Sequence, residues 1–347
     1  MIIWFLLILI VALVNIQVCR DGFFSDYLEK KQSNAIKGVF ILLVFVFHSL
    51  TDIKNCGFSF EHQIDWLAQA FHLEIGQLVV AMFFFYSGYG VMKSLLVKGE
   101  AYLNSYPKSR LLTTLLNFDI AVCFFILLAT IIGRRVSVSQ IALSLIGWES
   151  VGNSCWYIFV ILFCFLAFYL VFKLVGTRFK LGIVAIALVC LVGMFTLRLF
   201  KPSLWYNTML VFPAGIAYAV YADKLERLIQ KRYILSVVLL FAAFFSLHFL
   251  MRSHPLHGLT FNVKSIVFAL LIVVLTMKVR IGNQWLYWCG SSLFPLYIYQ
   301  RLPMISLRAM AGKEWIVGHP NLFICCCFVI TVGISLLYNK RFRIKLV

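Results

Sequence analysis

Long apolar runs alternate with short polar connectors along the whole chain. Each run approaches the roughly 20 residues that an α-helix needs to cross the hydrocarbon core of a bilayer. We predict about eleven such helices from this pattern. They are expected at 2–18, 37–52, 75–93, 113–133, 155–173, 181–198, 205–221, 233–250, 264–278, 285–300 and 320–338. The pattern therefore predicts an all-α, polytopic membrane bundle.

Composition supports a membrane protein and gives it an orientation. Of the 347 residues, 63% are hydrophobic and 13% are charged, which is too apolar for a soluble chain of this length. The formal net charge is +18. Every second connector is rich in basic residues, and together these connectors hold roughly two thirds of the 31 Lys and Arg residues. Connectors rich in Lys and Arg stay on the cytoplasmic side of the membrane. We expect the N-terminus outside and the C-terminal "YNKRFRIKLV" inside, with anionic lipids or a phosphorylated ligand, and no nucleic acid, as partners.

The expected helix 37–52 carries two ionisable residues, Lys37 and His48. Eleven steps of a helix bring them onto one stripe, about 16 Å apart along the axis. A titratable group at membrane depth is costly and is therefore a candidate functional residue. The alternative is that Lys37 extends to the lipid headgroups while His48 makes an interhelical hydrogen bond. The residues alone leave both interpretations open.

Polar residues elsewhere permit both structural and functional interpretations. Ser87 lies in "FFFYSGYG", where small residues suit either close helix packing or a break beside a cavity. Asp119 is expected to form a structural ion pair with Arg110 or Lys108, rather than to act in catalysis.

The segment "WESVGNSCWYIF" marks the point where the chain re-enters the membrane from outside. Its Trp and Tyr residues suit a membrane interface for amphipathic reasons alone. Aromatic rings beside amide and carboxylate groups also suit a carbohydrate, whose apolar ring faces stack on aromatics. The candidate acceptor-binding residues are Glu149, Asn153, Trp156 and Tyr157.

Motifs of several enzyme classes are missing from the sequence. It contains no HExxH spacing, no GxSxG nucleophile elbow and no Walker phosphate loop. This argues against a metallohydrolase, a serine hydrolase and an ATP-driven pump, and no metal site is expected.

Five segments in order resemble the membrane acyltransferase 3 family. They are "NAIKGVFILLVFVFHSL", "FFFYSGYGVMKS", "NSCWYIFVIL", "WYNTMLVFPAGIAYAVY" and "CGSSLFPLYIYQRLPMI". The likeness runs from about residue 32 to 338 and implies a ten-helix core. The resemblance divides the chain into 1–31, an extra N-terminal helix with its cytoplasmic loop, and 32–347, the acyltransferase-like membrane domain.

The resemblance implies a membrane enzyme, expected in a bacterial inner membrane. Such an enzyme moves an acyl group, usually acetyl, from cytoplasmic acetyl-CoA to a hydroxyl of an acceptor, which is an envelope or exported glycan or a glycolipid. Acetyl-CoA is then a co-substrate, and no bound cofactor is expected. His48 matches the catalytic histidine, and Lys37 stands where most members have arginine. Gln300 stands where many relatives have a further histidine.

The family's Arg-x-x-Arg pair would fall on "KSRLLTT". Arg110 matches its first position, Thr113 replaces the second arginine, and Lys108 is a candidate to compensate. We expect Lys37, Lys108 and Arg110 to bind the CoA phosphates.

His48 is expected to act as general base for the acceptor hydroxyl, or as carrier of a transient acyl group. Ser87 and Tyr89 are expected to line the thioester's path or to hydrogen-bond its oxygen. Two rivals remain. One is a transporter or flippase of a lipid-linked sugar, with His48 and Asp119 along its path. The other is a structural subunit.

Overall fold

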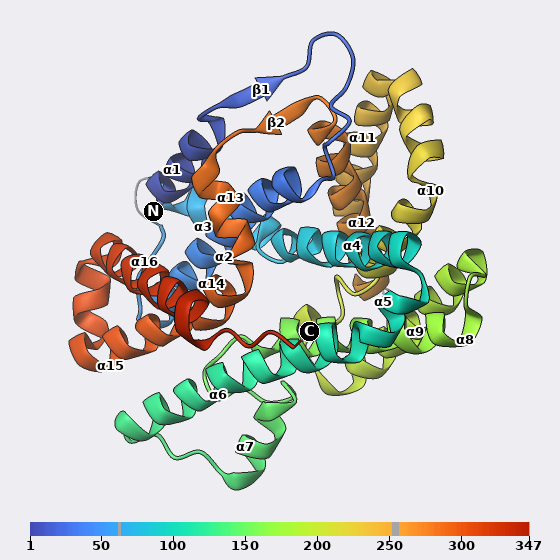
Figure 1. Ribbon diagram of the computed structural model, residues 1–347. Helices are drawn as coiled ribbons and strands as arrows, with labels where there is room; N and C mark the ends of the chain where they lie inside the picture. The colour runs from blue at the N-terminus through green and yellow to red at the C-terminus, as the bar shows by residue number, and fades with distance from the viewer. Residues whose placement is uncertain (62–63, 252–256, 347) are drawn as a thin grey trace.

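A computed structural model of the protein describes residues 1–61, 64–251 and 257–346, and it is almost entirely helical (Figure 1). The first half contains α1 (Ile2–Leu13), β1 (Ile16–Val18), α2 (Lys30–Asn55), α3 (Asp65–Ile75), η1 (Leu78–Val80), α4 (Ala81–Lys98), α5 (Glu100–Tyr106), the π-helix η2 (Pro107–Leu112), α6 (Thr113–Ile131), α7 (Val138–Leu145) and α8 (Cys155–Val175). The second half contains α9 (Phe179–Phe200), η3 (Ser203–Trp205), α10 (Val211–Lys231), α11 (Tyr233–Met251), α12 (His257–Thr276), β2 (Val279–Ile281), α13 (Gln284–Ser291), α14 (Leu293–Tyr299), α15 (Arg301–Gly318), α16 (Pro320–Leu337) and the π-helix η4 (Tyr338–Phe342).

Within the described residues, 8 helical segments are long and apolar enough to cross a membrane. They are Lys30–Asn55, Leu78–Lys98, Glu100–Ile131, Cys155–Val175, Phe179–Phe200, Tyr233–Met251, His257–Thr276 and Pro320–Phe342. The prediction of a polytopic helical membrane protein is confirmed, whereas this number is lower than the predicted count of about eleven.

Three predicted spans have no counterpart among these 8 segments of the described residues. The first is the 12-residue α1, which extends only about 18 Å before Asn15 adopts a left-handed conformation and β1 begins. The span expected at 205–221 begins later, as α10, and continues into a charged second half. The span expected at 285–300 is divided into α13 and α14, because Pro295 cannot donate a backbone hydrogen bond to Ser291.

Helix α2 lies in the middle of the fold and is buried along most of its length. Glycines allow its neighbours to approach closely. A Cβ atom on Gly290 of α13 would lie 1.8 Å from the carbonyl oxygen of Asn34 in α2. Helices α4 and α10 make a similar contact, because a Cβ on Gly88 would lie 2.1 Å from the carbonyl oxygen of Phe212. These contacts fix α2 and α4, the two helices with the main candidate residues, within the bundle.

The N-terminal segment packs against the rest of the chain. Strand β1 pairs antiparallel with β2, so the all-α prediction missed a two-stranded sheet. The Met1 amino group forms an ion pair with Asp65, and the Trp4 indole donates a hydrogen bond to Asn321. The Lys and Arg pattern places Met1 and Asp65 on the outer side of the membrane, and it places β1 and β2 on the inner side. The ion pair and the strand pairing therefore each join segments that lie on the same side.

Candidate functional site

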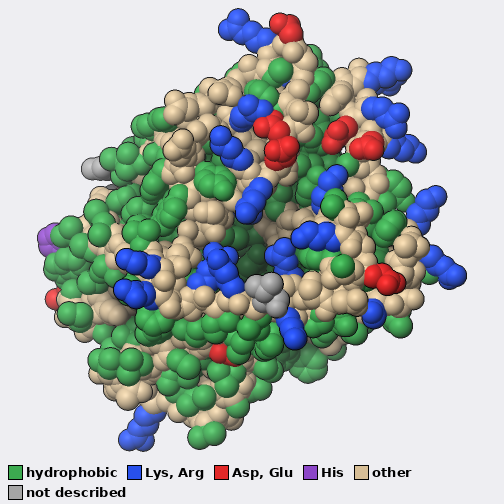
Figure 2. Space-filling view, viewed as in Figure 1, with side chains coloured by type: hydrophobic (Ala, Val, Ile, Leu, Met, Phe, Trp, Pro, Cys, Tyr) green, Lys and Arg blue, Asp and Glu red, His purple; other side chains and the backbone are tan. Residues whose placement is uncertain are grey.

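A cavity of about 450 Å³ opens between α2, α4 and η2. Four residues singled out from the sequence line it together: Lys37, Ser87, Tyr89 and Arg110. Figure 2 shows Lys and Arg side chains gathered around a hollow in the face that carries the C-terminal end of the chain. The arrangement brings together residues from three separate predicted segments.

The lining of this cavity is strongly basic. Lys30 and Lys93 join Lys37 and Arg110, and no carboxylate lines the cavity among the residues described. Uncompensated cations around a concave surface attract anions and focus their field into the cavity. A phosphate-bearing ligand fits this charge pattern.

Local structure explains how Lys37 and Arg110 reach the same cavity. Helix α2 begins at Lys30, earlier than predicted, so Lys37 lies about two turns inside the helix instead of at its start. Arg110 belongs to η2, and short π-helical segments are frequent at functional sites. Lys108 also belongs to η2, but it is exposed and does not line the cavity.

His48 lies on α2 about 16 Å beyond Lys37 along the helix axis. Its Nδ1 atom is buried and has no hydrogen-bond partner within the described part of the chain. An unpaired polar atom in the interior is costly and requires a functional or structural explanation. This feature supports His48 as a candidate reactive group.

A row of side chains connects the cavity with His48. The Ser87 hydroxyl makes a polar contact with the Tyr157 phenol. The Tyr157 ring lies 5.1 Å from the Tyr297 ring, and the Tyr297 ring lies 6.3 Å from the His48 imidazole. Tyr157, expected to bind an acceptor at the membrane surface, is therefore buried between the cavity and the histidine.

An ionic cluster lies one helical turn beyond His48 on α2. The buried Asp52 carboxylate accepts a hydrogen bond from Arg308 at 3.3 Å and lies 3.7 Å from the Arg301 guanidinium. Arg301 is also close enough to act electrostatically on the His48 imidazole. These three residues were not predicted from the sequence. The sequence could have indicated Asp52, because its spacing of four residues from His48 places both side chains on one helix face.

His72 of α3 is a further neighbour of this region. Its imidazole stacks on the Phe47 ring at 4.8 Å. Burial, together with the Lys54 ammonium, lowers the pKa of His72 below its ordinary value. This imidazole is therefore harder to protonate than that of a solvent-exposed histidine.

The expected ion pair of Asp119 is absent from the described structure. Asp119 belongs to none of the ion pairs formed by the described residues, and one of its carboxylate oxygens is buried without a hydrogen-bond partner among them. The reason is distance along a continuous helix. Nine residues separate Arg110 from Asp119, which corresponds to about 13 Å.

The remaining candidate acceptor residues occupy separate environments. Glu149 forms an ion pair with Lys201 at 3.3 Å, and the Lys201 ammonium also lies over the Trp148 ring. The buried Asn153 side chain accepts a hydrogen bond from the Val151 amide. Trp156 packs against the Tyr157 ring. These residues do not form one common pocket with His48 in the described structure.

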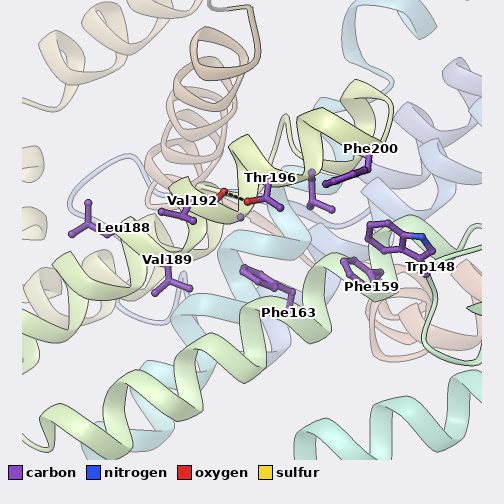
Figure 3. Close-up of a pocket in the computed structure, with 10 residues that line it drawn as sticks. Trp148, Phe159, Phe163, Leu188, Val189, Val192, Thr196 and Phe200 are labelled. Carbon is purple, nitrogen blue, oxygen red and sulfur yellow. Dashed lines mark hydrogen bonds between the residues drawn. The ribbon is translucent and has the colours of Figure 1, made fainter.

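A second concave surface, of about 610 Å³, is an apolar groove between α8 and α9. Figure 3 shows Trp148, Phe159 and Phe163 on one side and residues of α9 on the other. Among the described lining residues, Thr196 has the only side-chain hydroxyl, which donates to the Val192 carbonyl of its own helix. The groove supplies no acid, base or nucleophile from its described lining, so its chemistry differs from that of the basic cavity.

Metal ligation has no candidate among the described residues, where no group of three or more His, Cys, Asp or Glu side chains is arranged to hold an ion. No curated protein and no solved structure matches the chain. The family model described as "Acyltransferase domain" matches residues 31–340. This match runs from the helix that carries Lys37 and His48 to the last spanning helix. Because it covers nearly the whole sequence, the chain belongs to the acyltransferase 3 family and is a membrane acyltransferase.

Proposed function

We propose that the protein transfers an acyl group, with acetyl as the first candidate, from a cytoplasmic acyl-CoA to a hydroxyl of an exported or cell-envelope glycan. One observation carries the proposal: the basic cavity and His48 are joined by one helix, α2, and by a row of side chains between them. The cavity suits the anionic part of the donor, and the buried imidazole suits the reacting end.

The charge of the cavity supports a CoA donor. CoA carries several phosphate charges on its nucleotide and an uncharged pantetheine arm that ends in the thioester. Lys37 and Arg110 would hold phosphate oxygens at the cavity, with Lys30 and Lys93 adding positive charge. The distance of about 16 Å from Lys37 to His48 suits an extended arm directed along α2.

The chemistry at His48 requires one proton transfer. The acceptor oxygen attacks the thioester carbonyl carbon while an imidazole nitrogen takes the hydroxyl proton. The carbon–sulfur bond then breaks, the new ester leaves, and the proton passes to the CoA thiolate. Ser87 lines the basic cavity with its hydroxyl facing Tyr157, which supports it as a candidate hydrogen-bond donor to the carbonyl oxygen.

The proposed location is a bacterial inner membrane, with the N-terminus outside and the C-terminal end in the cytoplasm. The Lys and Arg pattern supports this orientation. Under it, the basic cavity opens to the cytoplasm and the Asp52 cluster lies on the outer side of His48. Donor and acceptor would then approach the imidazole from opposite sides of the membrane.

The test uses purified protein in lipid vesicles with radiolabelled acetyl-CoA and an envelope glycan. Wild-type protein is expected to place label in an alkali-labile ester. His48→Gln is expected to lose at least a hundredfold in rate, because general-base catalysis contributes about 10² to 10⁴. The Lys37→Ala, Arg110→Ala double variant is expected to raise the donor KM. Lys98→Ala removes an exposed lysine on α4 that does not line the cavity, and serves as the control.

Two results would overturn the proposal. One is full acyl transfer by correctly inserted His48→Gln protein. The other is wild-type protein that moves a lipid-linked sugar across the bilayer without transferring label, which would identify a transporter.

A further inference from the structure

A second polar cavity, of about 400 Å³, adjoins the first. Its walls come from η2, α6, the α13–α14 junction and the C-terminal segment. Arg110 lines both cavities and so lies between them. Arg343 and Lys345 add two more cations, and no carboxylate belongs to the described lining. The charge pattern is that of a second anion subsite next to the first.

The C-terminal segment reaches this cavity because a buried asparagine holds it. The Asn117 side chain of α6 donates to the Ile344 carbonyl oxygen and accepts from the Ile344 amide, both at 3.0 Å. Only 5% of Asn117 is exposed. Its carboxamide oxygen also accepts a hydrogen bond from the Tyr338 hydroxyl. A paired amide–backbone contact of this kind fixes both the position and the direction of the segment.

Thr113 gives the segment a second attachment. Its hydroxyl donates to the Lys108 carbonyl oxygen at 2.7 Å and accepts from the Leu346 amide at 3.4 Å. An arginine at position 113 would place a long cationic side chain where the C-terminal segment now lies. With threonine there, Arg343 and Lys345 supply positive charge at the same end of α6. Both residues lie beyond residues 31–340, which match the family.

We propose that the segment Arg343–Leu346 is part of the donor site and that Arg343 and Lys345 bind a donor phosphate distinct from those near Lys37. The inference rests on the proposed function and specifies its substrate: a nucleotide with phosphates at two separated positions. CoA meets this requirement, because its ribose 3′-phosphate is separate from the diphosphate that leads to pantetheine. Arg110 then lies between the two phosphate positions.

The experiment compares acetyl-CoA with acetyl-dephospho-CoA, which lacks only the 3′-phosphate. Wild-type protein is expected to show a roughly ten- to hundredfold lower KM for acetyl-CoA, as hydrogen bonds to a charged group predict. The Arg343→Ala, Lys345→Ala double variant is expected to raise the KM for acetyl-CoA to nearly that for the dephospho donor, whose own KM stays unchanged. Both residues are exposed, so removing their side chains leaves the core intact.

A matched control and a positioning variant accompany this pair. Lys340→Ala, Arg341→Ala removes the same charge from exposed residues that do not line the cavity, and the preference for the 3′-phosphate is expected to persist. Asn117→Ala releases the segment and is expected to weaken the preference without removing either cation. Rescue of that preference by Asn117→Gln would show that attachment of the segment, rather than general stability, is responsible.

The outcomes separate the two proposals. If wild-type protein uses neither donor, the proposed function fails. If it uses both donors equally, or if the Arg343→Ala, Lys345→Ala variant keeps the preference, the C-terminal subsite is wrong while the proposed function stands. A lipid phosphate is the other source of the same chemistry. If the double variant in detergent micelles instead loses only its binding of added phosphatidylglycerol relative to phosphatidylcholine, the donor assignment is also overturned.

Discussion

The ion pairs of Asp52 give the sharpest test of the packing beside His48. The Asp52 side chain is 3% exposed, whereas the Arg301 and Arg308 side chains are 32% and 34% exposed. Asp52→Asn preserves the shape and removes the charge. Breaking a buried pair costs about 3–5 kcal/mol when the remaining charge stays buried. Because water reaches both arginines, we expect a smaller loss, about 2 kcal/mol in the free energy of unfolding.

A double-mutant cycle isolates the interaction between Asp52 and Arg308. Equilibrium unfolding in mixed micelles with increasing sodium dodecyl sulfate would be measured for wild type, Asp52→Asn, Arg308→Gln and the double variant. The direct hydrogen bond at 3.3 Å predicts a coupling energy of about 1–2 kcal/mol. The donor KM is expected to stay at the wild-type value, because Lys37 lies about 22 Å from Asp52 along α2. Additive single effects, within about 0.3 kcal/mol, would refute the reasoning.

Three further predictions concern packing, the donor cavity and a polar network. Gly88→Ala places a methyl group 2.1 Å from the backbone oxygen of Phe212, so overpacking is expected to cost at least about 2 kcal/mol and to shift the same unfolding curve. Arg110→Ala is expected to raise the donor KM roughly tenfold or more, whereas Lys108→Ala, outside the cavity, is expected to change it little. A larger effect of Lys108→Ala than of Arg110→Ala in donor titrations would contradict the cavity assignment. Tyr27→Phe removes two hydrogen bonds of 2.8 Å, one with the Tyr218 hydroxyl and one to the Glu226 carboxylate. The free energy of unfolding is expected to fall by about 1–2 kcal/mol. An unchanged unfolding curve would contradict this prediction.

Residues close in sequence, or related by helical periodicity, were predicted well. Lys37 and His48 are on one helix, and their spacing is set by the regular rise of that helix. Lys37, Ser87, Tyr89 and Arg110 were identified separately from charge, small residues and motif likeness, and the fold brings them to one cavity. The helical periodicity of α2 also places Asp52 on the same helix face as His48. It could not identify the arginines that pair with that carboxylate, because they lie on another helix.

Predictions from the sequence were wrong where a local pattern was overridden by a backbone constraint or by the distance between two residues in the fold. The apolar segment 285–300 has the composition of one span, but Pro295 removes a backbone hydrogen bond and divides it. Asp119 and Arg110 share a continuous helical segment, yet the axial distance between them is too long for an ion pair.

The sequence alone determined that this is a helical membrane protein with His48 and Lys37 on a common helix. Hydrophobic run length, basic-residue asymmetry and helical spacing are local or additive properties, so they can be obtained without coordinates. Only the tertiary structure decided that Arg110 shares a cavity with Lys37 and that Asn117 holds the C-terminal segment beside it. These contacts join residues far apart in the chain, and their formation depends on how the helices pack around α2, which no single segment specifies.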